Sequence, residues 1–234
     1  MELMELSTEL RILIYEFLLV SDEPLRIGLN RTPWPPELTS GICCPGGKLR
    51  PMPAYPIGCL FGDKPDVCGI ILRVCKTIYL EASPLLYTQN IFHFSSSTTS
   101  CELLGPFLER ISSQARLLRH IIVEISGHSD RQSWSYVETS FWTFARLVEV
   151  SPAVETVCLR IDPIWLLGLH FSTRGIKVFR RINDILRRSG NIKTIALESN
   201  SSEIGGAQAS YNLVDLMQPD FRAEIFDLGW KIIS

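Results

Sequence analysis

The fold is decided by three stretches that share one apolar pattern: LRHIIV at 118–123, VETVCL at 154–159 and IKTIAL at 192–197. Apolar residues occupy the first, fourth and sixth positions of each stretch, and the stretches start 36 and 38 residues apart. Helical patterns precede them at about 102–116, 136–149 and 175–189. Helices and strands that alternate at one spacing are typical of parallel strands joined by right-handed crossovers. The sequence therefore predicts an α/β parallel array.

This repeat resembles an irregular leucine-rich repeat, in which strands line one face and helices the other. The units are long and lack the asparagine that follows the strand in that family, and a plain open α/β sheet would have the same period. The recurrence of the strand pattern in register favours the array, with about four units and a first strand at 90–94. The strand face of an array is its natural recognition surface. Its outward positions nominate Glu124, Arg160 and Glu198 for partner contact.

The N-terminal part has a different organisation. A helix is predicted from Ser7 to about Leu19, with Ser7 or Thr8 as its cap. Nine of the 14 prolines fall between Pro24 and Pro65, so residues 28–68 are predicted to be a long loop. A second helix is expected at about 70–87, kinked or interrupted at Pro84. We therefore divide the chain into a helical module at 1–94, with the insertion 28–68, and a helix–strand array at 95–234.

Two parts of this module resemble an F-box. The string LSTEL at 6–10, with the apolar positions that follow it, is similar to the opening of that motif. The string LRVCKTIYLEASPLLYTQNIFHF at 72–94 is similar to a large group of filamentous-fungal F-box-like proteins of unknown function. The sequence departs from the F-box pattern in two places, because Ser7 replaces a proline and the insertion 28–68 separates the two halves.

The resemblance implies a function in protein binding. F-box helices dock on the small adaptor subunit of SCF ubiquitin ligases, so the implied protein recognises a substrate protein for such a ligase. An alternative is an interaction domain that keeps the F-box-like fold without ligase docking, which Ser7 and the insertion favour. Three of the nominated residues, Leu10, Ile14 and Leu18, would also fit a core that packs on the 70–87 helix. By position, the resemblance nominates for adaptor contact Leu6, Glu9, Leu10, Ile14, Tyr15, Leu18 and Val74.

Charge argues against a globally basic nucleic-acid binder. The chain has 23 Lys and Arg against 25 Asp and Glu, for a net charge of −2. The predicted helix at 174–193 is nevertheless rich in arginine. It could contact nucleic acid or an acidic partner, although a solvated side of an amphipathic helix has the same composition. The candidate residues on it are Arg180, Arg181, Arg187 and Arg188.

No catalytic or cofactor motif is present in the sequence, which predicts a non-enzymatic protein without cofactor or metal. Four cysteines in the insertion, Cys43, Cys44, Cys59 and Cys68, lack the CxxC spacing of a zinc site. His93 lies between two phenylalanines in a predicted strand, which favours a structural role. The sequence contains no pattern of a signal peptide or membrane span, so we expect a cytoplasmic or nuclear protein with reduced thiols and no membrane contact.

Overall fold

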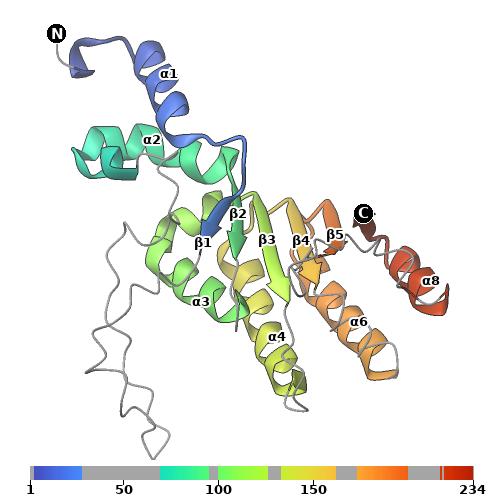
Figure 1. The fold of residues 1–234 in the computed structure, drawn as a ribbon. Helices are drawn as coiled ribbons and strands as arrows, with labels where there is room; N and C mark the ends of the chain where they lie inside the picture. Colours follow the sequence, from blue (N-terminus) through green and yellow to red (C-terminus); the bar gives the residue numbers. More distant parts are fainter. Residues whose placement is uncertain are drawn as a thin grey trace, which may run out of the picture.

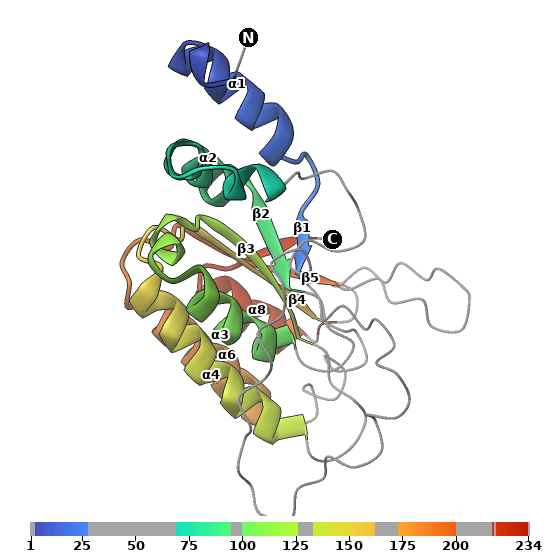
Figure 2. The ribbon, with the colours of Figure 1, turned by 90° about the vertical axis from the view of Figure 1, so that its left-hand side faces the viewer.

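The computed structural model describes residues 3–27, 69–94, 100–125, 133–161, 173–199, 217 and 219–233. Its centre is one sheet of six parallel strands in chain order. The connecting helices lie together on one face of the sheet (Figures 1 and 2). The predicted parallel helix–strand array is therefore confirmed. The strands are β1 (Leu25–Ile27), β2 (Ile91–Phe94), β3 (His120–Ile125), β4 (Thr156–Ile161), β5 (Thr194–Ser199) and β6 (Lys231–Ile233), and the helices on that face are α3 (Ser100–Ile111), α4 (Ser133–Val150), α6 (Thr173–Arg187) and α8 (Pro219–Asp227).

The two end strands of the sheet were not expected from the sequence. The predicted strands correspond to β2, β3, β4 and β5, whereas β1, β6 and the helix α8 between β5 and β6 carried no prediction. Because β1 and β2 belong to the segment 1–94, the sheet spans the domain boundary drawn after residue 94. The helix predicted at 136–149 is α4, which begins earlier, at Ser133. The helix predicted at 175–189 is α6, which ends at Arg187, and Gly190 in the loop that follows has φ +68°.

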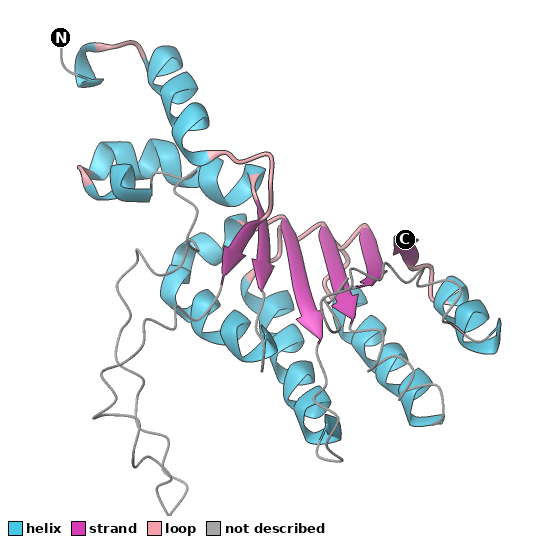
Figure 3. Cartoon of the chain, viewed as in Figure 1, coloured by secondary structure: helices cyan, strands magenta, loops and turns pink. Residues whose placement is uncertain are grey.

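The N-terminal module consists of short helical segments above the first strands (Figure 3). The predicted helix at 70–87 is divided, because a 3-10 turn ends at Arg73 and the α-helix begins only at Lys76. Pro84 lies inside that helix and does not end it. Ser7 caps the first helix, as predicted, by accepting a hydrogen bond from the Leu10 amide at 3.5 Å. The segments are η1 (Leu3–Glu5), α1 (Thr8–Leu19), η4 (Gly69–Arg73) and α2 (Lys76–Gln89), and a further 3-10 turn, η5 (Ser112–Leu117), leads into β3.

The core lies between the sheet and its helix layer. Alternate residues of each strand, such as Phe92 and Phe94 of β2, point toward the helices and are fully buried. Their rings pack against Phe107 of α3, with centroids 5.5 and 5.2 Å apart. At the other end of the sheet, the ring of Phe179 meets that of Trp230 at 5.5 Å. The array thus has one continuous core from β1 to β6.

A buried asparagine joins the module to the sheet. Asn90 donates from Nδ2 to the carbonyl oxygens of Leu19 and Leu86, at the C-terminal ends of α1 and α2. Its Oδ1 accepts a hydrogen bond from the Ser21 amide, on the segment that leads to β1. One side chain therefore satisfies backbone groups at two helix ends that no helical hydrogen bond would satisfy.

Candidate functional site

Helix α1 is apolar on two sides, and only one of them packs against the rest of the protein. The buried side carries Arg11, Tyr15 and Leu19, spaced four residues apart. Such residues lie above one another on a helix, so they form one stripe, which we call the inward stripe. Tyr15 and Leu19 are fully buried in the core. The inward stripe attaches α1 to α2.

An ion pair reinforces this attachment. The guanidinium of Arg11 donates to both carboxylate oxygens of Glu81 on α2, at 2.6 and 3.0 Å. The hydroxyl of Tyr15 donates to the same carboxylate at 3.2 Å. The hydrogen bonds from Arg11 hold the pKa of Glu81 below its usual value, whereas burial and then Glu81 raise the pKa of Tyr15. The pair fixes how α1 is rotated about its axis.

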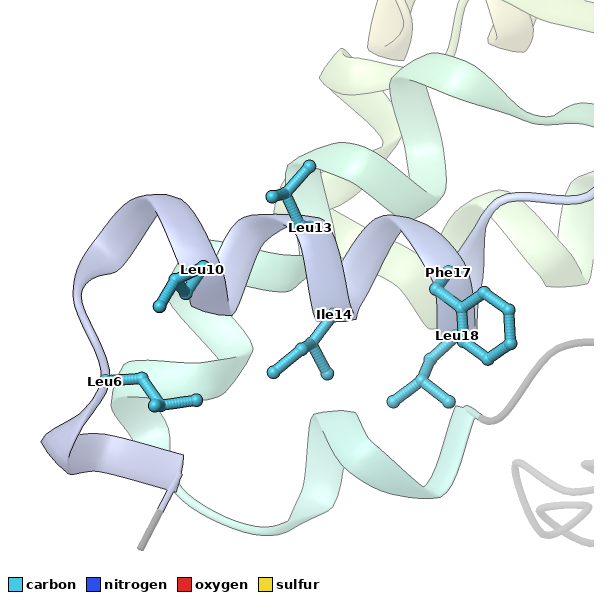
Figure 4. Close-up of a pocket in the computed structure, with 6 residues that line it drawn as sticks. All are labelled: Leu6, Leu10, Leu13, Ile14, Phe17 and Leu18. Atoms are coloured by element: carbon cyan, nitrogen blue, oxygen red, sulfur yellow. The ribbon is translucent and has the colours of Figure 1, made fainter. Parts of the chain in front are cut away.

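The other apolar side of α1 faces outward, and we call it the outward stripe. Its side chains line a shallow groove of about 360 Å³. Figure 4 shows five of them along the helix and Leu6 on the segment before it, with Ile14 and Leu18 pointing to the same side. Leu10 is 50% exposed, Leu13 59% and Phe17 85%, which is high for large apolar side chains. The residues that line the groove are Leu6, Leu10, Leu13, Ile14, Phe17 and Leu18.

The structure divides the residues nominated for adaptor contact between surface and core. Leu6, Leu10, Ile14 and Leu18 line the groove, whereas Tyr15 is fully buried. Tyr15 is therefore a core residue that holds α1 in place, and the prediction that it contacts the adaptor is wrong. The alternative of core packing was open for Leu10, Ile14 and Leu18, and of these only Leu18 packs, half-buried, against the core. Of the other two nominated residues, Glu9 is exposed in the first turn of α1 and Val74, in the turn before α2, is 65% exposed.

A second cluster lies on the sheet face away from the helices. Glu124, Arg160 and Glu198 are direct neighbours on β3, β4 and β5, as their alternation along the strands predicts. Arg160 donates from Nε and Nη2 to Glu198 Oε2, at 3.1 and 2.9 Å. His93 of β2 joins them, because its Nε2 lies 2.9 Å from Glu124 Oε1 and 3.4 Å from Arg160 Nη1. These four residues form a charged row across four strands.

Half of the charged row is closed to solvent. His93 and Glu124 are buried and lie within ion-pair distance of each other, whereas Arg160 and Glu198 are half-buried. Cys158 lies beside it, 3.6 Å from Glu198 Oε2. Burial, followed by the nearby Glu198 carboxylate, raises the pKa of the Cys158 thiol to about 12. A thiol that stays protonated at neutral pH is a poor nucleophile.

The arginines of the basic helix differ in what they contact. Arg180 donates to Glu224 of α8, with its Nη2 at 2.8 Å from Oε2, and the guanidinium of Arg181 lies 4.6 Å from the Phe141 ring centroid of α4. Arg187 donates to the carbonyl of Ile192 just beyond the helix. These three arginines therefore bind α6 to its surroundings. Arg188 is exposed, and no side-chain hydrogen bond or ion pair is found for it within the described residues.

The remaining expectations concern metals and membranes. The four cysteines considered for zinc lie outside the described residues. Among the side chains that the structure does describe, no three His, Cys, Asp or Glu are placed to hold a metal ion. Within the same residues, no helix combines the length and apolar character needed to cross a bilayer.

Comparison with known proteins identifies one family. A family model described as a domain of unknown function (DUF7730) matches residues 2–128, which is more than half of the chain. The match covers the N-terminal module and continues through β3. The comparisons with curated proteins and with solved structures found no match.

Proposed function

We propose that this chain, which belongs to the family defined by the domain of unknown function DUF7730, is a non-enzymatic, F-box-like interaction protein that docks on the adaptor subunit of an SCF-type ubiquitin ligase. The helix–strand array would then hold a substrate protein. This function requires the protein to work in the cytoplasm or the nucleus. The F-box resemblance of residues 6–20 and 70–94 suggests the adaptor subunit as the partner, and the exposed apolar side chains of α1 are the surface that would contact it.

The outward stripe is the observation that carries this proposal. Burying a large apolar side chain is worth roughly 1.5–3 kcal/mol, and Leu10, Leu13 and Phe17 are each half or more exposed. Covering the three would therefore contribute about 4 kcal/mol to binding. Contiguous apolar groups of this kind on a surface mark an interaction site, whereas scattered ones do not.

The inward stripe supports the same proposal. The Arg11–Glu81 ion pair and the buried Tyr15 fix the rotation of α1, so the outward stripe is presented without any rearrangement of the helix. A preorganised surface loses less conformational entropy when it binds. Ser7 also starts the helix where the F-box pattern has proline, so this departure leaves α1 intact.

Co-purification of the full chain with the fungal SCF adaptor subunit tests the proposal. We expect a stoichiometric complex for the natural sequence and for Phe226→Asp, which changes a residue on α8 that is 52% exposed. Leu10→Asp, at 50% exposure, should abolish the complex. Circular dichroism should show both variants folded, because neither changed side chain belongs to the core.

Two results would overturn the proposal, one for ligase docking itself and one for the surface that docks. A folded natural chain that forms no complex leaves the alternative function, an interaction domain with an F-box-like fold only. A complex that survives Leu10→Asp would show that the outward stripe is not the docking surface. If Leu10→Asp unfolds the chain, Phe17→Asp replaces it, since Phe17 is 85% exposed.

A further inference from the structure

Exposed basic side chains lie close together at the end of the sheet where the strands β3, β4 and β5 have their N-termini. The loops that lead from the helix layer into β3, β4 and β5 cover residues 112–119, 151–155 and 188–193. They contain four basic residues and one acidic residue, Glu155. All four cations are exposed. We call them the basic rim: Arg116, Arg119, Arg188 and Lys193.

Backbone hydrogen bonds hold the loops of the basic rim side by side. The carbonyl oxygen of Arg119 accepts from the amide of Glu155 at 2.9 Å, and the carbonyl oxygen of Glu155 accepts from the amide of Lys193 at 2.9 Å. The side chain of Asn191 adds a bond from Nδ2 to the Pro152 carbonyl at 2.7 Å. These bonds continue the register of the strands into the loops, so the rim is a rigid platform.

The rim keeps an excess of positive charge. Lys193 pairs with Glu155 at 2.7 Å, and this bond, reinforced by the charges of Lys193 and Arg119, lowers the pKa of Glu155. The described residues provide no carboxylate within ion-pair distance of Arg116, Arg119 or Arg188. Three helical segments end at these loops, and each end carries a partial charge of roughly −0.5. Four cations against one carboxylate leave +3, of which the helix ends offset roughly half.

We propose that the basic rim binds an extended acidic segment of a partner protein. Strands are about 4.8 Å apart, so Arg119 and Lys193, two strands apart, stand about 10 Å from each other. On a chain extended as a polyproline II helix, carboxylates three residues apart point to the same side and stand about 9 Å from each other, close to that separation. Nucleic acid fits less well, because its continuous line of phosphates would face Glu155, whereas the intervening side chains of such a peptide point away from the rim.

The test measures binding of the full chain to a fluorescein-labelled peptide of ten glutamates, by anisotropy at low salt. The triple variant Arg116→Gln, Arg119→Gln, Arg188→Gln should lose affinity about tenfold, since three exposed charge pairs are removed. A control triple variant, Arg26→Gln, Arg73→Gln, Arg222→Gln, removes the same charge from exposed sites elsewhere and should change affinity less than about twofold. Both triples should leave α1 unchanged, and so adaptor binding serves as an independent readout.

Three outcomes would overturn the proposal. The natural chain fails to bind the glutamate peptide at low salt, or both triple variants weaken binding equally, which indicates net charge alone. In the third, single-stranded oligothymidylate of equal charge binds more tightly than the peptide and loses affinity in the rim variant, which assigns the rim to nucleic acid. A rim-specific loss with the peptide, together with weaker oligothymidylate binding, supports the proposal.

Discussion

Replacement of Asn90 by alanine is expected to destabilise the whole protein. The side chain is fully buried and makes three hydrogen bonds, to the carbonyls of Leu19 and Leu86 and from the amide of Ser21, all between 2.8 and 2.9 Å. Alanine removes the partner of each backbone group and offers none in return. A buried polar group without a partner costs about 1–3 kcal/mol.

The magnitude follows from the three bonds. At about 1 kcal/mol each, Asn90→Ala should lower the free energy of unfolding by about 3 kcal/mol. In a domain of this size each kcal/mol shifts the melting temperature by about 2–4 °C, so the loss amounts to roughly 6–12 °C. Asn90→Asp should be at least as damaging, because a carboxylate keeps the bond from Ser21 but cannot donate to the two carbonyls.

Urea unfolding followed by circular dichroism measures this loss. The matched control is Asn191→Ala, because Asn191 is exposed and its Nδ2 makes a single hydrogen bond, to the Pro152 carbonyl. The control should lose about 0.5 kcal/mol. If Asn90→Ala loses no more than this control, or if Asn90→Asp is as stable as the natural protein, then the asparagine does not join the module to the sheet and the reasoning fails.

Three further predictions concern single residues. The raised pKa of Cys158, about 12, predicts that iodoacetamide at pH 8 labels exposed Cys75 and leaves Cys158 unmodified in the folded protein, and peptide mass mapping that finds early labelling of Cys158 would contradict it. Arg180 lowers the pKa of Glu224 from its ordinary 4.5, so the ionised pair stabilises the fold above about pH 4.5 and this contribution is lost as pH falls through the lowered pKa. The difference in urea stability between the natural protein and Glu224→Gln should thus shrink on acidification, and a difference that is constant with pH would refute the pair. Tyr15→Ala should cost about 4 kcal/mol in the same assay, and a loss below about 1 kcal/mol would show that α1 is not packed on α2.

The strands of the sheet could be predicted where they are long. β3, β4 and β5 each have six residues, enough to repeat the apolar pattern and reveal the period. β1 and β6 have only three residues each. Three residues are too few to distinguish strand alternation from chance. These segments are strands because each pairs with an outer strand of the sheet, β2 or β5, and local sequence does not reveal such pairing.

The two sides of α1 show why a site is harder to predict than a helix. Apolar residues four apart indicate a buried stripe, and the outward stripe has that pattern more clearly than the inward one. The inward stripe contains Arg11, which reads as a surface residue until Glu81 is found opposite it. The resemblance nominated Tyr15 together with the outward leucines because it matches residues by their place in the motif and does not tell which side of the helix each side chain faces. The rotation of α1 is set by a contact between residues 70 apart in sequence, which no local pattern contains.

Charged surfaces are hard to predict from sequence for a related reason. The sequence groups Arg180, Arg181, Arg187 and Arg188 because they lie on one helix, yet the first three contact neighbouring elements or the backbone beyond the helix. The structure instead groups Arg188 with Arg119, which is 69 residues earlier and belongs to another unit of the array. In a repeat of parallel strands, equivalent loops stand side by side, so residues one or two units apart form a surface together. A charged surface in such a protein must therefore be sought across units, at equal positions in the repeat, before it is sought along any single helix.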